Sequence, residues 1–360
     1  MAATITIATD FSEHASSSSS IKSLSESGIT SIPSSFDASK NLHDLAVLDS
    51  PQNSTIPIID FSLLTSTNPQ QRCKIIQHLG KACEEWGFFL LINHGIPKRL
   101  MESMMEGVKG FFNLSDEEKR EFQGKHIFDP IRCGSSFNTA IEKVHCWRDF
   151  LKVFVHPHFH FPHKPPGFSD TAFEYLKEIR GIIKELLKGV SESLGLEADY
   201  ISKAVNLESS FQVFIANLYP PCPQPELAVG ILPHSDHGLL TIASENGTNG
   251  FQILHNGNWV KVIAPPNALM VNTADLLEVV SNGKYKSNVH RAVVKSNSTR
   301  ISMVTFNGSS LDQVISPAPE LVDETHPPVF SCLTYRQFYE IQQSNSLHNK
   351  SVLDRVRIIP

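Results

Sequence analysis

Apolar residues recur at helical spacing along several segments in the first two thirds of the chain. In residues 173–194 they fall three or four positions apart, which places them on one face of an amphipathic helix, and Gly195 follows the last of them. Residues 69–86 repeat the pattern before Gly87, and residues 98–112 repeat it again. These segments predict three helices of several turns each.

Shorter helices are predicted in three other places. Ser115 is followed three positions later by Glu118, which is the spacing of a capping box that opens a helix. Residues 21–29 favour a short helix at the edge of the fold. Residues 335–344 favour a helix that lies across the mouth of a barrel formed by the strands after Phe211.

The pattern changes after Phe211 to short apolar runs separated by Gly, Asn and Pro turns. Many short strands with frequent turns indicate a barrel or a sandwich. Two similar runs, 56–61 and 88–93, lie in the first half of the chain. The strand-like runs of the second half are residues 211–218, 239–243, 251–254, 259–263, 268–272, 287–294 and 301–306.

Two histidines and a carboxylate stand out among these runs. Because successive side chains on a strand alternate faces, His234 and Asp236 would point the same way, with Ser235 behind them. His290 would return on a different strand of the same barrel. Two histidines and one carboxylate hold non-haem Fe(II) with coordination positions left open, although zinc accepts the same ligand types. We therefore expect a metal centre at these three residues.

A second polar pair follows the last histidine. Alternation puts Arg300 and Ser302 on one face of a strand and Ile301 on the other. A guanidinium forms charge-assisted hydrogen bonds to a carboxylate, and a hydroxyl adds one more. A metal centre beside such a pair indicates an oxidative enzyme that takes a keto acid as co-substrate.

These motifs and the blocks around them resemble the plant 2-oxoglutarate and Fe(II)-dependent dioxygenases over roughly residues 20–355. That family includes anthocyanidin synthase, flavanone 3-hydroxylase and hyoscyamine 6-hydroxylase. The blocks that carry the resemblance are IPIIDFS from Ile56, CEEWGFFLLINHGIP from Cys83, FFNLSDEEK from Phe111, WRDFL from Trp147, NLYPPCPQPELAVG from Asn217, HSDHGLLTI from His234, the run from Gly257 to Arg291, and RISMVTF from Arg300.

The resemblance implies a mainly β fold with flanking helices around a double-stranded β-helix, or jelly-roll, core. Residues 1–54 would be a polar and partly disordered N-terminal segment, and residues 55–210 a helix-rich N-terminal dioxygenase region. Residues 211–310 would form the jelly-roll catalytic core. Residues 311–360 would be a C-terminal helical extension.

The resemblance also implies the chemistry. Fe(II) would be held by His234, Asp236 and His290, and O₂ and 2-oxoglutarate would be consumed, with ascorbate as reductant. Succinate and CO₂ would be released while a substrate is hydroxylated, desaturated or demethylated. The protein would hold the metal, orient the substrate and exclude water, and no side chain need act as a general base. The residues implied for 2-oxoglutarate are Arg300, Ser302, Tyr219 and Asn217.

Strand phase extends the site to a substrate pocket. Val213 and Ile215 lie on the same strand face as Tyr219, so they would line the pocket if Tyr219 reaches the co-substrate. Phe306 lies on the same face of its strand as Arg300. Phe306 would offer a platform to a flat aromatic or polycyclic substrate, although a plain core phenylalanine is the competing interpretation. Phe137 and Asn138 lie where the family has loop residues that contact the substrate, so the resemblance implies that they belong to the pocket as well. The expected substrate is a small, flat, apolar plant metabolite.

The sequence departs from the family pattern in two places. Anthocyanidin synthase-like members carry a lysine near the position of Ile215 and a tyrosine near that of Cys133, where they contact a flavonoid, so a flavonoid substrate is not supported. Ser244 and Glu245 replace a more apolar run and are expected to alter a strand end.

Two other functions remain open at this stage. The first is an Fe(II) oxidase of the same fold that does not use 2-oxoglutarate, and succinate production would separate the two enzymes. The second is a catalytically silent barrel that binds a small molecule. The intact set of metal ligands argues against the silent barrel.

Composition and charge exclude some classes of binding partner and indicate the cellular compartment. The net charge of −6 argues against nucleic acid or an anionic membrane as the main partner, and no run of 18 apolar residues occurs. Six scattered cysteines without C-x-x-C spacing indicate free thiols in a reducing compartment. We expect a cytoplasmic monomer that acts on a small molecule.

Two further segments have the composition of a targeting or a metal-binding sequence. The Ser-rich first 20 residues contain Asp10 and Glu13 and no basic residue before Lys22, which favours a disordered tail over a transit peptide. The histidines around residue 158 stand among prolines, which favours a loop over a second metal site.

Overall fold

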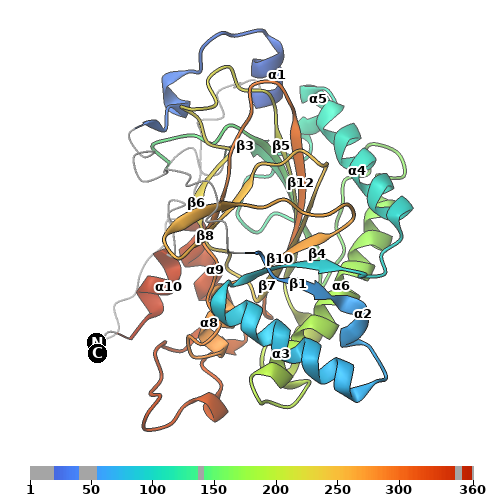
Figure 1. Cartoon of the computed structure of the whole chain (residues 1–360). Helices are drawn as coiled ribbons and strands as arrows, with labels where there is room; N and C mark the ends of the chain where they lie inside the picture. Colours follow the sequence, from blue (N-terminus) through green and yellow to red (C-terminus); the bar gives the residue numbers. More distant parts are fainter. Residues whose placement is uncertain (1–19, 40–54, 137–141, 345–350, 359–360) are drawn as a thin grey trace.

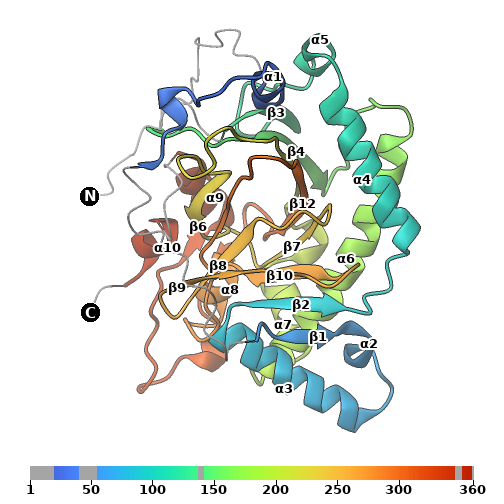
Figure 2. The ribbon, with the colours of Figure 1, turned by 45° about the horizontal axis from the view of Figure 1, so that its top comes forward.

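Two sheets form the centre of the molecule (Figures 1 and 2). The computed structural model describes residues 20–39, 55–136, 142–344 and 351–358. The larger sheet has the strand order β1-β2-β10-β7-β12-β5-β4-β3, the smaller has the order β6-β11-β8-β9, and β13 pairs with β14. The strands are β1 (Ile58–Asp60), β2 (Phe88–Ile92), β3 (Ile131–Ser135), β4 (Asp149–His156), β5 (Gln212–Tyr219), β6 (Ile231–His234), β7 (Leu240–Glu245), β8 (Phe251–His255), β9 (Asn258–Lys261), β10 (Leu269–Thr273), β11 (His290–Ala292), β12 (Arg300–Asn307), β13 (Val314–Ile315) and β14 (Leu333–Thr334).

The two sheets pack face to face over an apolar cluster. The larger sheet contributes Phe88, Ala243 and Met270 to this cluster, and the smaller sheet contributes Ile253 and Val260. Each strand turns one row of side chains toward the partner sheet, because side chains alternate along a strand. The predicted mainly β fold with a jelly-roll core and flanking helices is confirmed.

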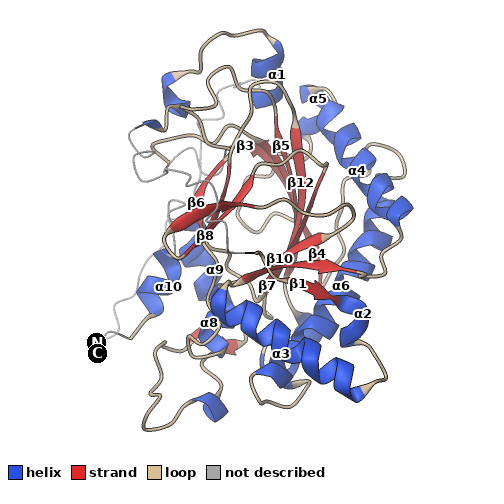
Figure 3. Ribbon diagram, viewed as in Figure 1, coloured by secondary structure: helices blue, strands red, loops and turns tan. Residues whose placement is uncertain are grey.

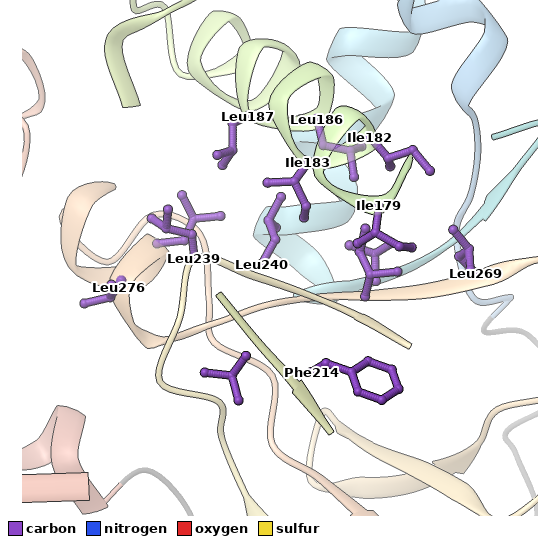
Figure 4. Packing of buried hydrophobic residues seen from close by; sticks show 14 of the residues in the cluster. Ile179, Ile182, Ile183, Leu186, Leu187, Phe214, Leu239, Leu240, Leu269 and Leu276 are labelled. Atoms are coloured by element: carbon purple, nitrogen blue, oxygen red, sulfur yellow. The ribbon is translucent and has the colours of Figure 1, made fainter. Parts of the chain in front are cut away.

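Helices surround the two sheets, and α6 packs on the larger one (Figure 3). Their bounds are α1 (Ile21–Glu26), α2 (Phe61–Leu64), α3 (Pro69–Glu85), α4 (Lys98–Asn113), α5 (Asp116–Arg120), α6 (Phe168–Ser193), α7 (Tyr200–Ala204), α8 (Asp275–Val280), α9 (Tyr335–Ser344) and α10 (Ser351–Val356). The apolar face of α6 packs on the strands and the residues beside them, as Figure 4 shows. The labelled members of this cluster are Ile179, Ile182, Ile183, Leu186 and Leu187 from α6, together with Phe214, Leu239, Leu240, Leu269 and Leu276.

The predicted helices form close to their expected ends. The capping box is present, with the Ser115 hydroxyl accepting from the Glu118 amide and the Glu118 carboxylate accepting from Ser115. The long helix α6 begins at Phe168, before its predicted start at residue 173. The ring of Phe168 packs so closely on Gly107 that a Cβ there would lie 2.3 Å from it. This contact between α4 and α6 involves distant segments, so local periodicity did not predict it.

The N-terminal half supplies strands as well as helices. β1 to β4 all lie between residues 55 and 210, and they join the same sheet as β5, β7, β10 and β12. The short helix α1 is attached to this sheet because the amides of Ile21 and Lys22 both donate to the carboxylate of Asp149, at 2.9 Å each. The sequence pattern changes between the predicted regions 55–210 and 211–310. The larger sheet nevertheless contains strands from both regions.

One predicted strand is shorter than expected. The run 287–294 forms only the three-residue strand β11, because Ser287 is tied to α8. Its amide donates to Glu278 and its hydroxyl to Asp275, both at 2.6 Å. Helix α8 itself was not predicted.

The six cysteines are all free, and Cys73 and Cys332 are exposed. Within the described ranges, no helix combines the length and apolar character needed to cross a membrane.

Candidate active site

Three potential metal ligands converge at the smaller sheet. His234 ends β6 and His290 begins β11, and the two residues are direct partners in the antiparallel pair. Oδ1 of Asp236 lies 3.7 Å from Nε2 of His234 and 3.6 Å from Nε2 of His290. Two atoms that are each about 2.1 Å from one metal can be at most about 4.2 Å apart, so both distances fit a shared ion.

Hydrogen bonds fix the orientation of each of these side chains. Nδ1 of His234 lies 2.8 Å from the carbonyl oxygen of Leu232, and Nδ1 of His290 lies 3.2 Å from that of Asn288. Nδ1–H donation to a carbonyl leaves Nε2 as the free lone pair, which is the arrangement that metal-binding histidines use.

Asp236 is held by a side chain from the opposite sheet. Nδ2 of Asn272, on β10, donates to Oδ2 of Asp236 at 2.8 Å. This hydrogen bond leaves Oδ1 directed at the two imidazoles, so Asn272 selects which oxygen faces them.

The protonation states suit metal binding. Burial, and then the neighbouring His290, lower the pKa of His234 to about 4. Burial alone would raise the pKa of Asp236, but the two histidines hold it below its ordinary value. A neutral imidazole at His234 beside an ionised carboxylate at Asp236 is the combination that ligates a cation.

The residues expected to bind 2-oxoglutarate meet on β5 and β12. Arg300 pairs with Tyr219, and Ser302 pairs with Asn217. The guanidinium carbon of Arg300 lies 5.0 Å from the centre of the Tyr219 ring. Nδ2 of Asn217 donates to the Ser302 hydroxyl at 3.3 Å, so that hydroxyl keeps its own proton for another acceptor.

Arg300 has one carboxylate partner, which the sequence did not reveal. Its Nε donates to Oε2 of Glu245 at 2.9 Å, and the two side chains are only 5% and 6% exposed. Glu245 ends β7 opposite Ser302, so the strand continues where an altered strand end was expected. Nη1 of Arg300 is buried without a hydrogen-bond partner in the described part of the chain. A buried, unpaired guanidinium nitrogen is costly unless a ligand satisfies it.

The expected pocket residues have different surroundings. Val213 is buried, whereas Ile215 and Phe306 are half-buried. The Phe306 ring stacks on His237, with centroids 5.3 Å apart and an interplanar angle of 15°. Nδ1 of His237 lies 2.8 Å from the Tyr335 hydroxyl on α9, so α9 reaches the neighbour of Asp236. Phe137 and Asn138 lie outside the described residues.

The histidine-rich loop has no part in this centre. His156 ends β4, and its Nδ1 lies 2.7 Å from the carbonyl oxygen of Ser210. Over the ranges that the structure describes, the only group of His, Cys, Asp or Glu side chains close enough to hold an ion is His234, Asp236 and His290.

Several residues of the site were missed from the sequence, although one had a signal. Asn272 is the polar member of an apolar strand. A polar side chain inside a buried strand is a reason to search for its partner. The pairings of Glu245 and His237 have no such signal, because their partners lie on distant segments.

Two family models match the chain. The 2OG-Fe(II) oxygenase superfamily matches residues 210–309, and the N-terminal family described as non-haem dioxygenase in morphine synthesis matches residues 56–170. The first match contains the three metal-site residues and the arginine and serine on β12. The second covers α3, α4 and the strands β1 to β4.

Relatives and solved structures agree with these matches. The chain is 43% identical over 305 residues to 2-oxoglutarate-dependent dioxygenase 19 of Oryza sativa subsp. japonica, covering 84% of this chain and 90% of that protein. It is 37% identical over 313 residues to thebaine 6-O-demethylase of Papaver somniferum, covering 84% and 85%. A crystal structure of JOX2 in complex with 2OG, Fe and JA superposes with a TM-score of 0.84 at 28% identity, covering 95% of this chain and 98% of that one.

The chain therefore belongs to the 2OG-Fe(II) oxygenase superfamily and is a 2-oxoglutarate-dependent dioxygenase, an oxidoreductase. Membership implies Fe(II) and 2-oxoglutarate, and the His–Asp–His group fits such an ion. The family acts on small molecules.

Proposed function

We propose that this enzyme oxidises a small, flat and largely apolar plant metabolite by hydroxylation, desaturation or demethylation. Fe(II) and 2-oxoglutarate, when bound, supply the oxidising chemistry with O₂ and give succinate and CO₂. The observation that carries the proposal is the buried, unpartnered Nη1 of Arg300 on the same sheet as the polar face that includes Ser302. A carboxylate is the partner that such a nitrogen lacks.

Each residue of the site has a defined task in this proposal. His234, Asp236 and His290 hold the metal, and Asn272 keeps one carboxylate oxygen directed at it. Tyr219 supports the guanidinium with the face of its ring. The co-substrate carboxylate is bound by Arg300 and Ser302, with Asn217 fixing the serine hydroxyl.

The substrate is oriented by apolar side chains. Val213 and Phe306 are direct partners across β5 and β12, and Ile215 follows on the same face. Along these strands they follow the co-substrate positions, so they offer an apolar wall next to the reacting centre. Excluding water there protects the reaction from side products.

The test is succinate release from 2-oxoglutarate under air, with Fe(II) and ascorbate and a pool of plant metabolites. We expect substrate-stimulated succinate from the wild type and a loss of about 100-fold or more in His234→Ala, because the metal carries the oxidising chemistry. His158→Ala is the matched control, because that histidine is exposed and lies outside the metal group, and it should retain full activity.

Other outcomes would favour the two alternatives. O₂ uptake without succinate would favour an Fe(II) oxidase of the same fold. A ligand-dependent thermal shift without O₂ uptake would favour a silent binding barrel. Either result from folded, iron-loaded protein contradicts the proposal.

We also propose that the protein is a cytoplasmic monomer of specialised metabolism that uses ascorbate as reductant. Six free cysteines support a reducing compartment. A fluorescent fusion and size-exclusion chromatography test the location and the oligomeric state. Omission of ascorbate from the succinate assay tests the reductant.

A further inference from the structure

Cationic side chains cluster on the inner face of strands β3 and β4. Arg132 is the direct partner of Lys152 across these strands, and Lys152 is in turn the direct partner of Ile215 on β5. Arg148 immediately precedes β4, and its guanidinium carbon lies 5.5 Å from the centre of the Phe150 ring. Like charges directly opposite each other on a sheet are destabilising. The arrangement therefore needs a compensating group.

Lys152 has only neutral hydrogen-bond partners among the described residues. Its Nζ donates to the Tyr339 hydroxyl at 2.8 Å and to Oε1 of Gln343 at 3.1 Å, and the side chain is 7% exposed. Burial raises the pKa of Tyr339, so that hydroxyl stays protonated. An ammonium has three donors, and these two acceptors leave one unused among the described residues. Burial, and then the neighbouring Arg132 and Arg148, hold the pKa of Lys152 well below its ordinary value, so its charged form needs an anion beside it.

The two arginines of the cluster also lack a carboxylate partner in the part of the chain that the structure describes. Arg148 donates to Oδ1 of Asn217 at 2.7 Å and to the carbonyl oxygen of Ser136. Arg132 is half-buried and makes no ion pair or hydrogen bond to a described side chain. Within the described ranges, three basic side chains thus share this face with neutral hydrogen-bond acceptors alone.

The nearby acidic groups are engaged elsewhere. Asp149 on β4 accepts from the amides of α1, and strand alternation places it on the opposite face from Lys152. Asp129 lies close enough to affect the pKa of Arg132, but its carboxylate accepts from the backbone amides of Lys125 and His126. Neither of these two carboxylates forms an ion pair with the cluster.

The cluster borders the proposed substrate pocket and lies apart from Arg300. Strands β4 and β3 follow β5 on the side away from β12, which carries Arg300. Tyr339, the partner of Lys152, packs edge-on against His237 with ring centroids 5.2 Å apart, and His237 stacks on Phe306. A ligand that reaches from Phe306 past Ile215 therefore meets the two opposed cations.

We propose that the substrate carries a carboxylate, which Arg132 and Lys152 bind at the end of the pocket away from the 2-oxoglutarate site. This rests on the proposed function and refines it, because the substrate body stays flat and apolar while one end is anionic. A guanidinium matches the planar geometry of a carboxylate, and the free ammonium donor adds a second contact. The bound carboxylate neutralises charge that the described residues leave uncompensated.

The test compares flat acids with their neutral amides. Benzoate, cinnamate and 2-naphthoate are titrated against benzamide, cinnamamide and 2-naphthamide by calorimetry, using full-length protein with Fe(II) and 2-oxoglutarate under nitrogen. We expect at least one acid to bind about tenfold or more tightly than its amide, because hydrogen bonds to charged groups are the stronger ones. Lys152→Met and Arg132→Gln should each remove most of that preference, while Lys152→Arg should retain it.

Two controls make the result specific. Lys109→Met alters an exposed lysine of α4 that pairs with Glu106, and it should keep the preference for the acid. The affinity for 2-oxoglutarate should be the same in every variant. If 2-oxoglutarate binds but no acid outbinds its amide, the carboxylate site is overturned while the proposed function stands. If 2-oxoglutarate fails to bind the wild type, the proposed function itself fails.

Ligand-free stability gives a second test that does not depend on the probes. Replacing a buried, uncompensated cation by an apolar side chain of similar length is neutral or stabilising. Lys152→Met should therefore melt at the same temperature as the wild type or higher. A clear fall in melting temperature would show that Lys152 is a structural residue bound to Tyr339, and it would overturn the proposal.

Discussion

The ion pair between Arg300 and Glu245 makes a sharp prediction about 2-oxoglutarate. Both side chains are nearly inaccessible, and the guanidinium already donates Nε to a carboxylate while Nη1 has no partner among the described residues. A bound co-substrate would bring a second carboxylate to the same guanidinium. We predict that Glu245→Gln, which keeps the shape and an acceptor oxygen, weakens the ligand-free fold and tightens 2-oxoglutarate binding.

The loss of stability follows from the change in hydrogen-bond type. A hydrogen bond to a charged group contributes about 1.5–3 kcal/mol and a neutral one about 0.5–1.5 kcal/mol, so Glu245→Gln should cost about 1–2 kcal/mol. Glu245→Leu removes the acceptor altogether and leaves the guanidinium without its carboxylate, which costs about 3–5 kcal/mol.

The gain in affinity follows from the repulsion between two carboxylates. Groups on two edges of one guanidinium lie about 7 Å apart, and at an effective dielectric constant of about 20 they repel by roughly 2 kcal/mol. Removing one charge should therefore lower the Kd for 2-oxoglutarate by roughly 30-fold.

The assay combines urea unfolding with calorimetric titration of 2-oxoglutarate, using Fe(II)-loaded protein under nitrogen. Glu192→Gln is the matched control, because Glu192 pairs with Arg72 on the outer helices α3 and α6 and is partly exposed. It should change stability by less than about 1 kcal/mol and leave the Kd unchanged. Equal or weaker 2-oxoglutarate binding by Glu245→Gln would refute the assignment of Arg300 as the anchor, or the competition between the carboxylates.

Three further predictions concern the metal ligands and the fold. Asn272→Ala frees Asp236 to rotate and should weaken metal binding by about 10–100-fold in a titration of the metal alone; an unchanged Kd would contradict the orienting role. The metal-free protein should lose stability as pH falls from about 6.5 to about 4, because the unfolded chain binds a proton at His234 that the buried side chain refuses; a flat urea midpoint over this range would refute it. Ser115→Ala removes the cap of α5 and should cost about 1 kcal/mol in urea unfolding, with unchanged 2-oxoglutarate affinity as the control; unaltered stability would show that the capping box contributes nothing.

The sequence alone determined the features that depend on local geometry. The ends of α3 and the start of α4 followed from apolar period and from flanking Pro and Gly, because helix formation depends on residues within one or two turns. The shared direction of His234 and Asp236, and of Arg300 and Ser302, followed from strand alternation. The match to family blocks then supplied the fold and the reaction class.

Tertiary structure decided the relations between distant segments. The pairing of Arg300 with Glu245, the hydrogen bond from Asn272 to Asp236 and the meeting of Arg132 with Lys152 all join different strands. No periodicity encodes such contacts, because strand order and register are set by how the whole chain buries its apolar faces. The sequence therefore determined which side chains could bind iron and a keto acid, and packing of the sheets decided which basic side chains lack a carboxylate partner among the described residues.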